Sequence, residues 1–71
     1  MQTTRQEQNV REAVYSMTLI QQDIERLQSY LTDEGMSERE RRKILYSIRT
    51  SKVSLVRWTN ALDEALDELF S

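Results

Sequence analysis

Apolar side chains recur at alternating intervals of three and four residues along two stretches of the chain. The first series consists of Val10, Ala13, Met17, Ile20, Ile24, Leu27 and Leu31. The second series consists of Ile44, Ile48, Ser51, Leu55, Trp58, Leu62, Ala65 and Leu69. This spacing is the heptad repeat of helices that pack along one another as coiled coils. The pattern therefore predicts two amphipathic helices, each with one apolar stripe.

The polar segment between the two series carries the signals that end one helix and begin the next. Ser37 is followed by Glu40 at capping-box spacing, and Thr4 and Glu7 repeat the pattern near the start of the chain. Gly35 is the single glycine, and we expect it to adopt the left-handed conformation that ends a helix. The prediction is one domain, 1–71, with a helix over about 5–33, a turn at 33–37 and a helix over about 38–70.

The short turn makes the two helices antiparallel, so residues whose numbers sum to 71 or 72 should face each other. This register places Trp58 opposite the small Ala13, and the small Ser51 opposite Ile20. Large side chains facing small ones are what close packing requires. The predicted fold class is all-α, an antiparallel two-helix hairpin of the coiled-coil type.

One seam between two helices does not cover every apolar side chain. Three of them share the fifth heptad position and should lie on one flank of the hairpin: Val14, Leu45 and Leu66. Docking of a second hairpin there would make a homodimeric four-helix bundle, and these three residues are the predicted oligomer interface. Two alternatives stay open: a close approach along the small residues of the opposite flank, and a monomeric hairpin with single surface apolar residues. The small residues of the opposite flank are Ser47, Ser54 and Ala61.

Composition argues against catalysis. The chain of 71 residues contains no cysteine and no histidine, so it lacks a thiolate nucleophile and the commonest general base and metal ligand. One glycine does not make a phosphate-binding loop. The four carboxylates near the end of the chain lack the histidines of di-iron helical sites, and we expect them to be solvated. We nominate no catalytic residue, cofactor or metal ligand, and we recognise no family motif.

Charge is unevenly distributed although the net charge is only −2. Residues 1–38 contain three basic and seven acidic side chains, residues 39–57 contain seven basic and one acidic, and residues 58–71 contain four acidic and no basic side chains. One interpretation is that these blocks complement each other within the hairpin. The other is that the basic block binds a partner.

The outward face of the second predicted helix supports the interpretation as a binding surface. It mixes basic, aromatic and aliphatic side chains, and the candidate partner-binding residues are Arg42, Lys43, Tyr46, Arg49, Val53, Val56 and Arg57. Tyr and Arg are favoured at the energetic centres of protein interfaces, whereas Arg with an aromatic residue also suits a nucleic-acid backbone. A face that meets only solvent is the third interpretation.

The functional expectation is a small non-enzymatic protein-interaction module, a regulator, inhibitor or assembly adaptor, that binds another protein through this face. One alternative is a small regulator that binds RNA or DNA through the basic stretch 39–57, with Arg42, Lys43, Arg49, Lys52 and Arg57 as the contacts; the net acidity disfavours it. Another is a structural subunit of a larger assembly. No apolar run approaches the roughly 20 residues of a membrane span, so we expect no membrane partner and a cytoplasmic location.

Overall fold

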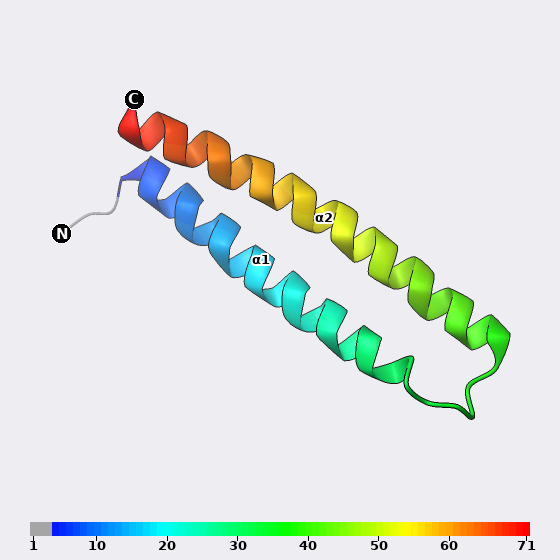
Figure 1. Cartoon of the computed structure of the whole chain (residues 1–71). Helices are drawn as coiled ribbons and strands as arrows, with labels where there is room; N and C mark the ends of the chain where they lie inside the picture. Colours follow the sequence, from blue (N-terminus) through cyan, green and yellow to red (C-terminus); the bar gives the residue numbers. More distant parts are fainter. Residues whose placement is uncertain (1–3) are drawn as a thin grey trace.

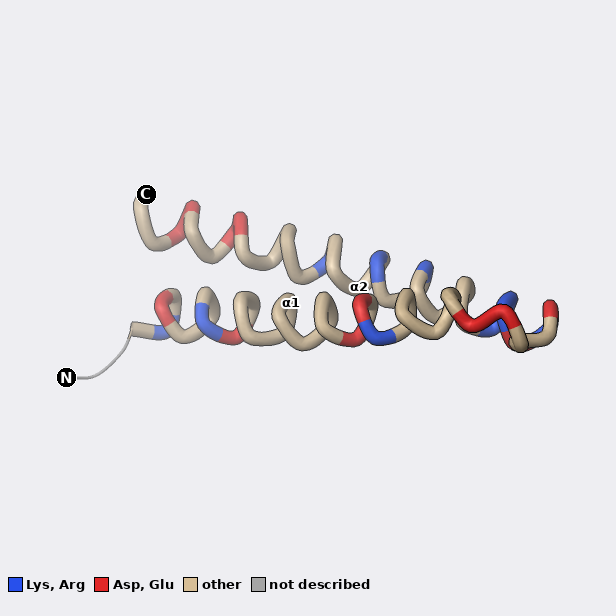
Figure 2. Tube along the Cα trace, turned by 60° about the horizontal axis from the view of Figure 1, so that its bottom comes forward, with Lys and Arg blue, Asp and Glu red and all other residues tan. Residues whose placement is uncertain are grey.

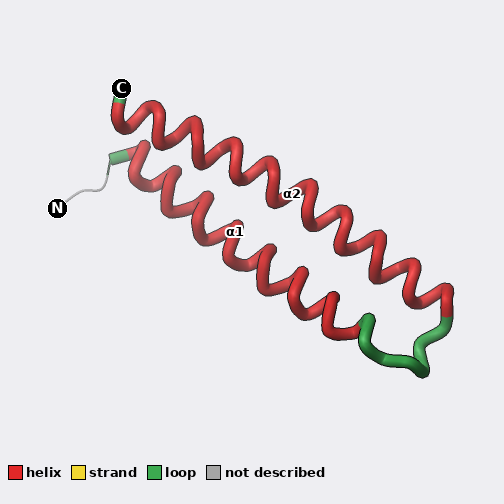
Figure 3. Tube along the Cα trace, viewed as in Figure 1, coloured by secondary structure: helices red, strands yellow, loops and turns green. Residues whose placement is uncertain are grey.

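The computed structural model describes residues 4–71, which form two antiparallel helices joined by a short turn (Figure 1). Helix α1 spans Arg5–Tyr30 and helix α2 spans Glu38–Phe70. The start of α1 and the end of α2 lie at one end of a rod 53 Å long, and the turn lies at the other (Figure 3). The predicted all-α hairpin is confirmed. The first three residues of the predicted domain 1–71 lie outside the described residues.

Both helices begin where the capping patterns predict. The Thr4 hydroxyl accepts a hydrogen bond from the backbone N–H of Glu7 at 3.2 Å, and the Ser37 hydroxyl accepts one from the N–H of Glu40 at the same distance. Both cap residues have extended backbone conformations. A hydroxyl in this position satisfies one of the N–H groups that the first helical turn leaves without a partner.

The end of α1 differs from the prediction. The helix was expected to continue to Asp33 but ends at Tyr30, after which the N–H groups of residues 31–33 bond to carbonyl groups three residues back. Gly35 does not have the positive φ that was predicted for it. The physical reason is a local turn around Asp33, whose carboxylate accepts the N–H of Gly35 at 2.9 Å and whose carbonyl accepts the N–H of Met36 at 3.3 Å. An Asx turn of this kind reverses the chain without a left-handed residue.

The seam between the helices is made by the two heptad series. Every residue of both series is buried or half-buried, and the most buried side chains are those of Ala13, Ile24, Ile48 and Ala65. Ala13 is only 1% exposed, so its small side chain is fully covered within the seam. The heptad prediction of the buried face is therefore confirmed.

One contact beside the turn joins α2 to the end of α1. The guanidinium of Arg41 donates to the carbonyl oxygen of Leu31 at 3.5 Å. Trp58 lines a groove together with Asn9 and Glu12 of α1. The pairing of individual seam residues stays a prediction.

Candidate interaction surface

The predicted partner-binding residues all lie exposed along α2. Because α2 is helical without a break, their spacing places most of them on the side that faces away from the α1 seam. Tyr46 is the most prominent, with 72% of its surface exposed, and Val53 and Val56 are also exposed. The structure thus displays three apolar anchors and four basic side chains on one helix: Arg42, Lys43, Arg49 and Arg57.

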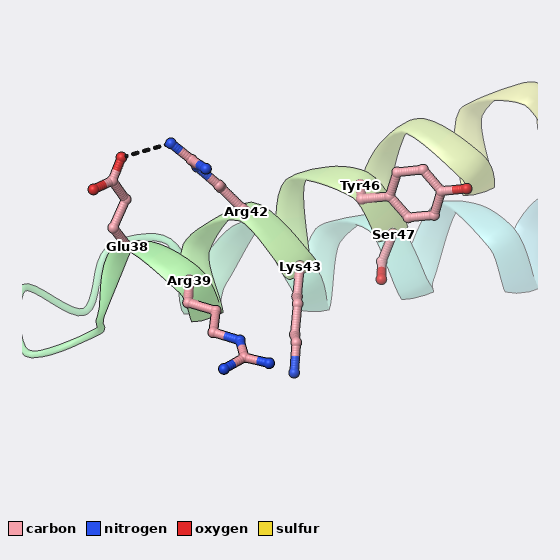
Figure 4. A pocket seen from close by; sticks show the side chains of 6 residues that line it. All are labelled: Glu38, Arg39, Arg42, Lys43, Tyr46 and Ser47. Atoms are coloured by element: carbon pink, nitrogen blue, oxygen red, sulfur yellow. Dashed lines mark hydrogen bonds and ion pairs between the residues drawn. The ribbon is translucent and has the colours of Figure 1, made fainter.

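The end of this surface nearest the turn contains a shallow depression (Figure 4). It is lined by Glu38, Arg39, Arg42, Lys43, Tyr46 and Ser47. Arg42 donates to the carboxylate of Glu38 at 3.1 Å, whereas the side chains of Arg39 and Lys43 extend away from this pair, on the same side of the helix as each other. Both members of the Arg42 pair are highly exposed, so the pair contributes only about 0.3 to 0.5 kcal/mol. The depression therefore offers cationic donors beside an aromatic ring.

The charge blocks do not neutralise each other through ion pairs across the hairpin in residues 4–71. The two ion pairs there each lie within one helix, Arg26 with Asp23 in α1 and Arg42 with Glu38 in α2. Figure 2 shows acidic positions near the C-terminal end of α2 and basic positions from its middle towards the turn. The interpretation that the blocks complement each other within the hairpin finds no ion pair to support it among these residues.

The predicted oligomer flank is partly exposed. Val14 and Leu45 are about half exposed, whereas Leu66 is half-buried against the hairpin. A groove on the same flank exposes Val56 next to the buried Ile24. On the opposite flank, Ser47 and Ala61 are exposed and Ser54 is half-buried. Apolar surface is thus available on the flank that was predicted to dimerise.

Sequence reasoning overlooked a second apolar surface, on the outer face of α1. Tyr15, Leu19 and Tyr30 are all exposed there. Their spacings of four and eleven residues place them on one side of the helix, and this spacing was the signal available in the sequence. They lie outside the heptad positions that form the seam.

Two other features are absent from the part of the chain that the structure describes, a cluster of metal ligands and a membrane-spanning helix. In residues 4–71 no three carboxylates are grouped so that they could hold a metal ion. Neither of the two described helices has the length and apolarity needed to cross a membrane. Comparison with known proteins adds no functional information, because no protein-family model, curated protein or solved structure matches the chain.

Proposed function

We propose that this protein is a small non-enzymatic interaction module, a regulator, inhibitor or assembly adaptor, that binds another protein through the outer face of α2. The observation that carries the proposal is the exposure of Tyr46 on a face that also exposes Val53, Val56 and several arginines. A tyrosine that is free of the seam contributes little to the stability of the hairpin but offers a large amphipathic contact to a partner. Arginine beside tyrosine is the composition of interface centres.

Self-association into a four-helix bundle belongs to the same proposal. The half-exposed Val14 and Leu45 support it, because a two-helix protein of 71 residues buries little apolar surface on its own. A bundle would cover the flank and leave the outer face of α2 to a partner.

The test is a capture experiment with matched tyrosine variants. Tyr46→Ala removes the proposed anchor, and Tyr15→Ala removes a tyrosine of similar exposure, 66%, from the outer face of α1. We expect a protein that the wild-type chain captures from cells to be lost by Tyr46→Ala and retained by Tyr15→Ala. The captured protein is then purified and titrated against all three chains, with at least a tenfold weaker Kd expected for Tyr46→Ala. Equal affinities of the two variants would refute the proposal.

Binding of RNA or DNA is the second candidate function, favoured by the absence of ion pairs between the basic stretch 39–57 and α1 in the described residues. The candidate phosphate contacts are Arg42, Lys43, Arg49, Lys52 and Arg57. Phosphate binding weakens steeply with salt, because each neutralised phosphate releases condensed counterions. A partner whose capture survives nuclease treatment and 300 mM salt supports the protein-binding function, whereas capture that is lost under both conditions supports the nucleic-acid function.

A further inference from the structure

The outer face of α2 contains a continuous stripe that crosses both charge blocks. We call it the outer stripe; its residues are spaced alternately three and four apart, and all are exposed: Arg42, Tyr46, Arg49, Val53, Val56, Asn60, Asp63, Asp67 and Phe70. This is the spacing of a helix surface that packs along another helix. The outer stripe therefore has the geometry of a second seam, on the side of α2 opposite the first.

The order of side chains along the outer stripe makes two copies of it complementary when they are aligned antiparallel. Two valines lie at the centre, with basic residues towards the turn and acidic residues towards the C-terminus. When a second α2 is aligned antiparallel, so that Val53 faces Val56 of the other copy, Arg42 faces Asp67 and Tyr46 faces Asp63. The remaining layers pair Arg49 with Asn60, and Arg39 with Phe70. Each layer of the outer stripe thus sets apolar against apolar, cation against anion, or a hydrogen-bond donor against an acceptor, and Arg39, one position beyond the stripe, meets an aromatic ring.

The positions beside the outer stripe agree with the same alignment. On one side Leu45 would lie next to Leu66 of the other copy, and on the other side Lys43 would lie next to Glu64. Leu45 is half exposed in the hairpin, and Lys43 and Glu64 are exposed, so these side chains are available for such contacts. A parallel alignment would instead set Arg42 against Arg42 and Asp67 against Asp67, and like charges in contact are destabilising.

We propose that the occupant of the outer face of α2 is a second copy of this chain, bound antiparallel through the outer stripe. The inference rests on the proposed function, in which this face is a protein-binding surface; it names a second copy as the occupant and so replaces the bundle through the Val14 flank proposed above. Because the outer stripe and the α1 seam lie on opposite sides of α2, the dimer is a layer of four helices with the two α2 helices at its centre. In a square four-helix bundle the flank with Val14 would be buried instead.

Substitutions at two valines of equal exposure distinguish the outer-stripe dimer from the square four-helix bundle. Val14 in α1 and Val53 in α2 are each 48% exposed, so a glutamate at either position disturbs the isolated hairpin to a similar extent. The masses of the wild-type chain, Val53→Glu and Val14→Glu are measured by light scattering over a range of concentrations. We expect the wild-type chain and Val14→Glu to reach twice 8.5 kDa, and Val53→Glu to stay near 8.5 kDa at all concentrations. A dimer that Val14→Glu disrupts and Val53→Glu does not would overturn the inference in favour of the bundle.

Charge reversal tests the antiparallel orientation. Arg42→Asp and Asp67→Arg each replace two attractive contacts per dimer with two repulsive ones, so each should weaken dimerisation about tenfold. The double variant restores opposite charges in the antiparallel dimer and should recover the wild-type Kd within about threefold. Arg11→Asp makes the same change of charge on α1 and serves as the control. If the double variant is no stronger than either single variant, the antiparallel alignment is wrong.

Failure of this inference is distinguishable from failure of the proposed function. A wild-type chain that stays monomeric at every concentration overturns the second copy as occupant, while the Tyr46 and Tyr15 captures still decide whether the face binds another protein. A dimer that depends on Val53, together with capture of nucleic acid alone, refutes the heterologous partner and leaves the dimer in place.

Discussion

Replacing Ile48 with alanine tests the seam on which the hairpin depends. Ile48 is 8% exposed, so the substitution removes three carbon atoms from a nearly dry environment. At about 0.8 kcal/mol for each buried carbon the transfer term is about 2.4 kcal/mol, and incomplete collapse of the cavity raises the cost to about 3 kcal/mol. For a domain of this size that loss corresponds to a fall in Tm of about 12 to 24 °C.

Leu19→Ala is the matched control, because it also removes three carbon atoms but from a side chain that is 47% exposed. Its expected cost is about 1 kcal/mol, since roughly half of the apolar surface is already in water. Both variants are melted by circular dichroism at one chain concentration, because association would otherwise shift Tm by mass action. If the two variants melt within a few degrees of each other, Ile48 is not in the seam and the packing of α1 on α2 described above is wrong.

The Ile48→Ala variant also tests which residues of α1 and α2 face each other. The predicted register, in which the numbers of facing residues sum to 71 or 72, places Ile24 opposite Ile48, and both are buried. Residues in contact show coupling energies of about 0.5 to 3 kcal/mol in a double-mutant cycle, whereas independent residues add within about 0.5 kcal/mol. Additive costs of Ile24→Ala and Ile48→Ala would show that these two side chains do not face each other.

Three further substitutions test local features of the hairpin by their effect on stability. Tyr46→Ala should change Tm by less than about 3 °C, because the side chain is exposed; a fall of 10 °C or more at low concentration would place Tyr46 in a packed contact within the hairpin. Gly35→Ala should be neutral or stabilising by up to about 1 kcal/mol in urea melts, since φ is not positive and the new Cβ would meet only the Asp33 carboxylate, at 3.3 Å; a left-handed Gly35 would instead give a clear loss. Ser37→Ala should cost about 1 kcal/mol in the same melts by removing the cap on Glu40, and an unchanged midpoint would contradict the capping role.

The seam was predictable because burial in a two-helix protein follows from spacing alone. A single partner helix covers one stripe of its neighbour, and the stripe must recur every three or four residues. Ser51 illustrates the strength of this rule: it is polar, yet its place in the heptad series correctly predicts that it is half-buried. The helix starts were predictable for a similar reason, since a hydroxyl cap is a local interaction between residues three apart.

The end of α1 was less predictable because several weak local interactions compete there. The hydroxyls of Ser29 and Thr32 donate to carbonyl groups three residues back, and the Asp33 carboxylate binds the N–H of Gly35. Each of these hydrogen bonds stabilises the fold by less than one buried apolar side chain does. The spacing of apolar residues does not predict them. The surface partner is harder still to predict, since exposed residues experience no constraint from the fold itself.

The charge order along α2 connects folding to association. The negative end of a helix dipole disfavours acidic side chains by about 0.3 to 1 kcal/mol each, yet Asp67 and Glu68 lie in the last turn of α2, which contains no basic residue. Within residues 4–71 no cation of α1 forms an ion pair with them. An antiparallel second copy would bring Arg42 to Asp67. Asp67→Asn should therefore raise the Tm of the dilute hairpin and weaken the dimer at the same time, and effects of the same sign on both would contradict the antiparallel pairing.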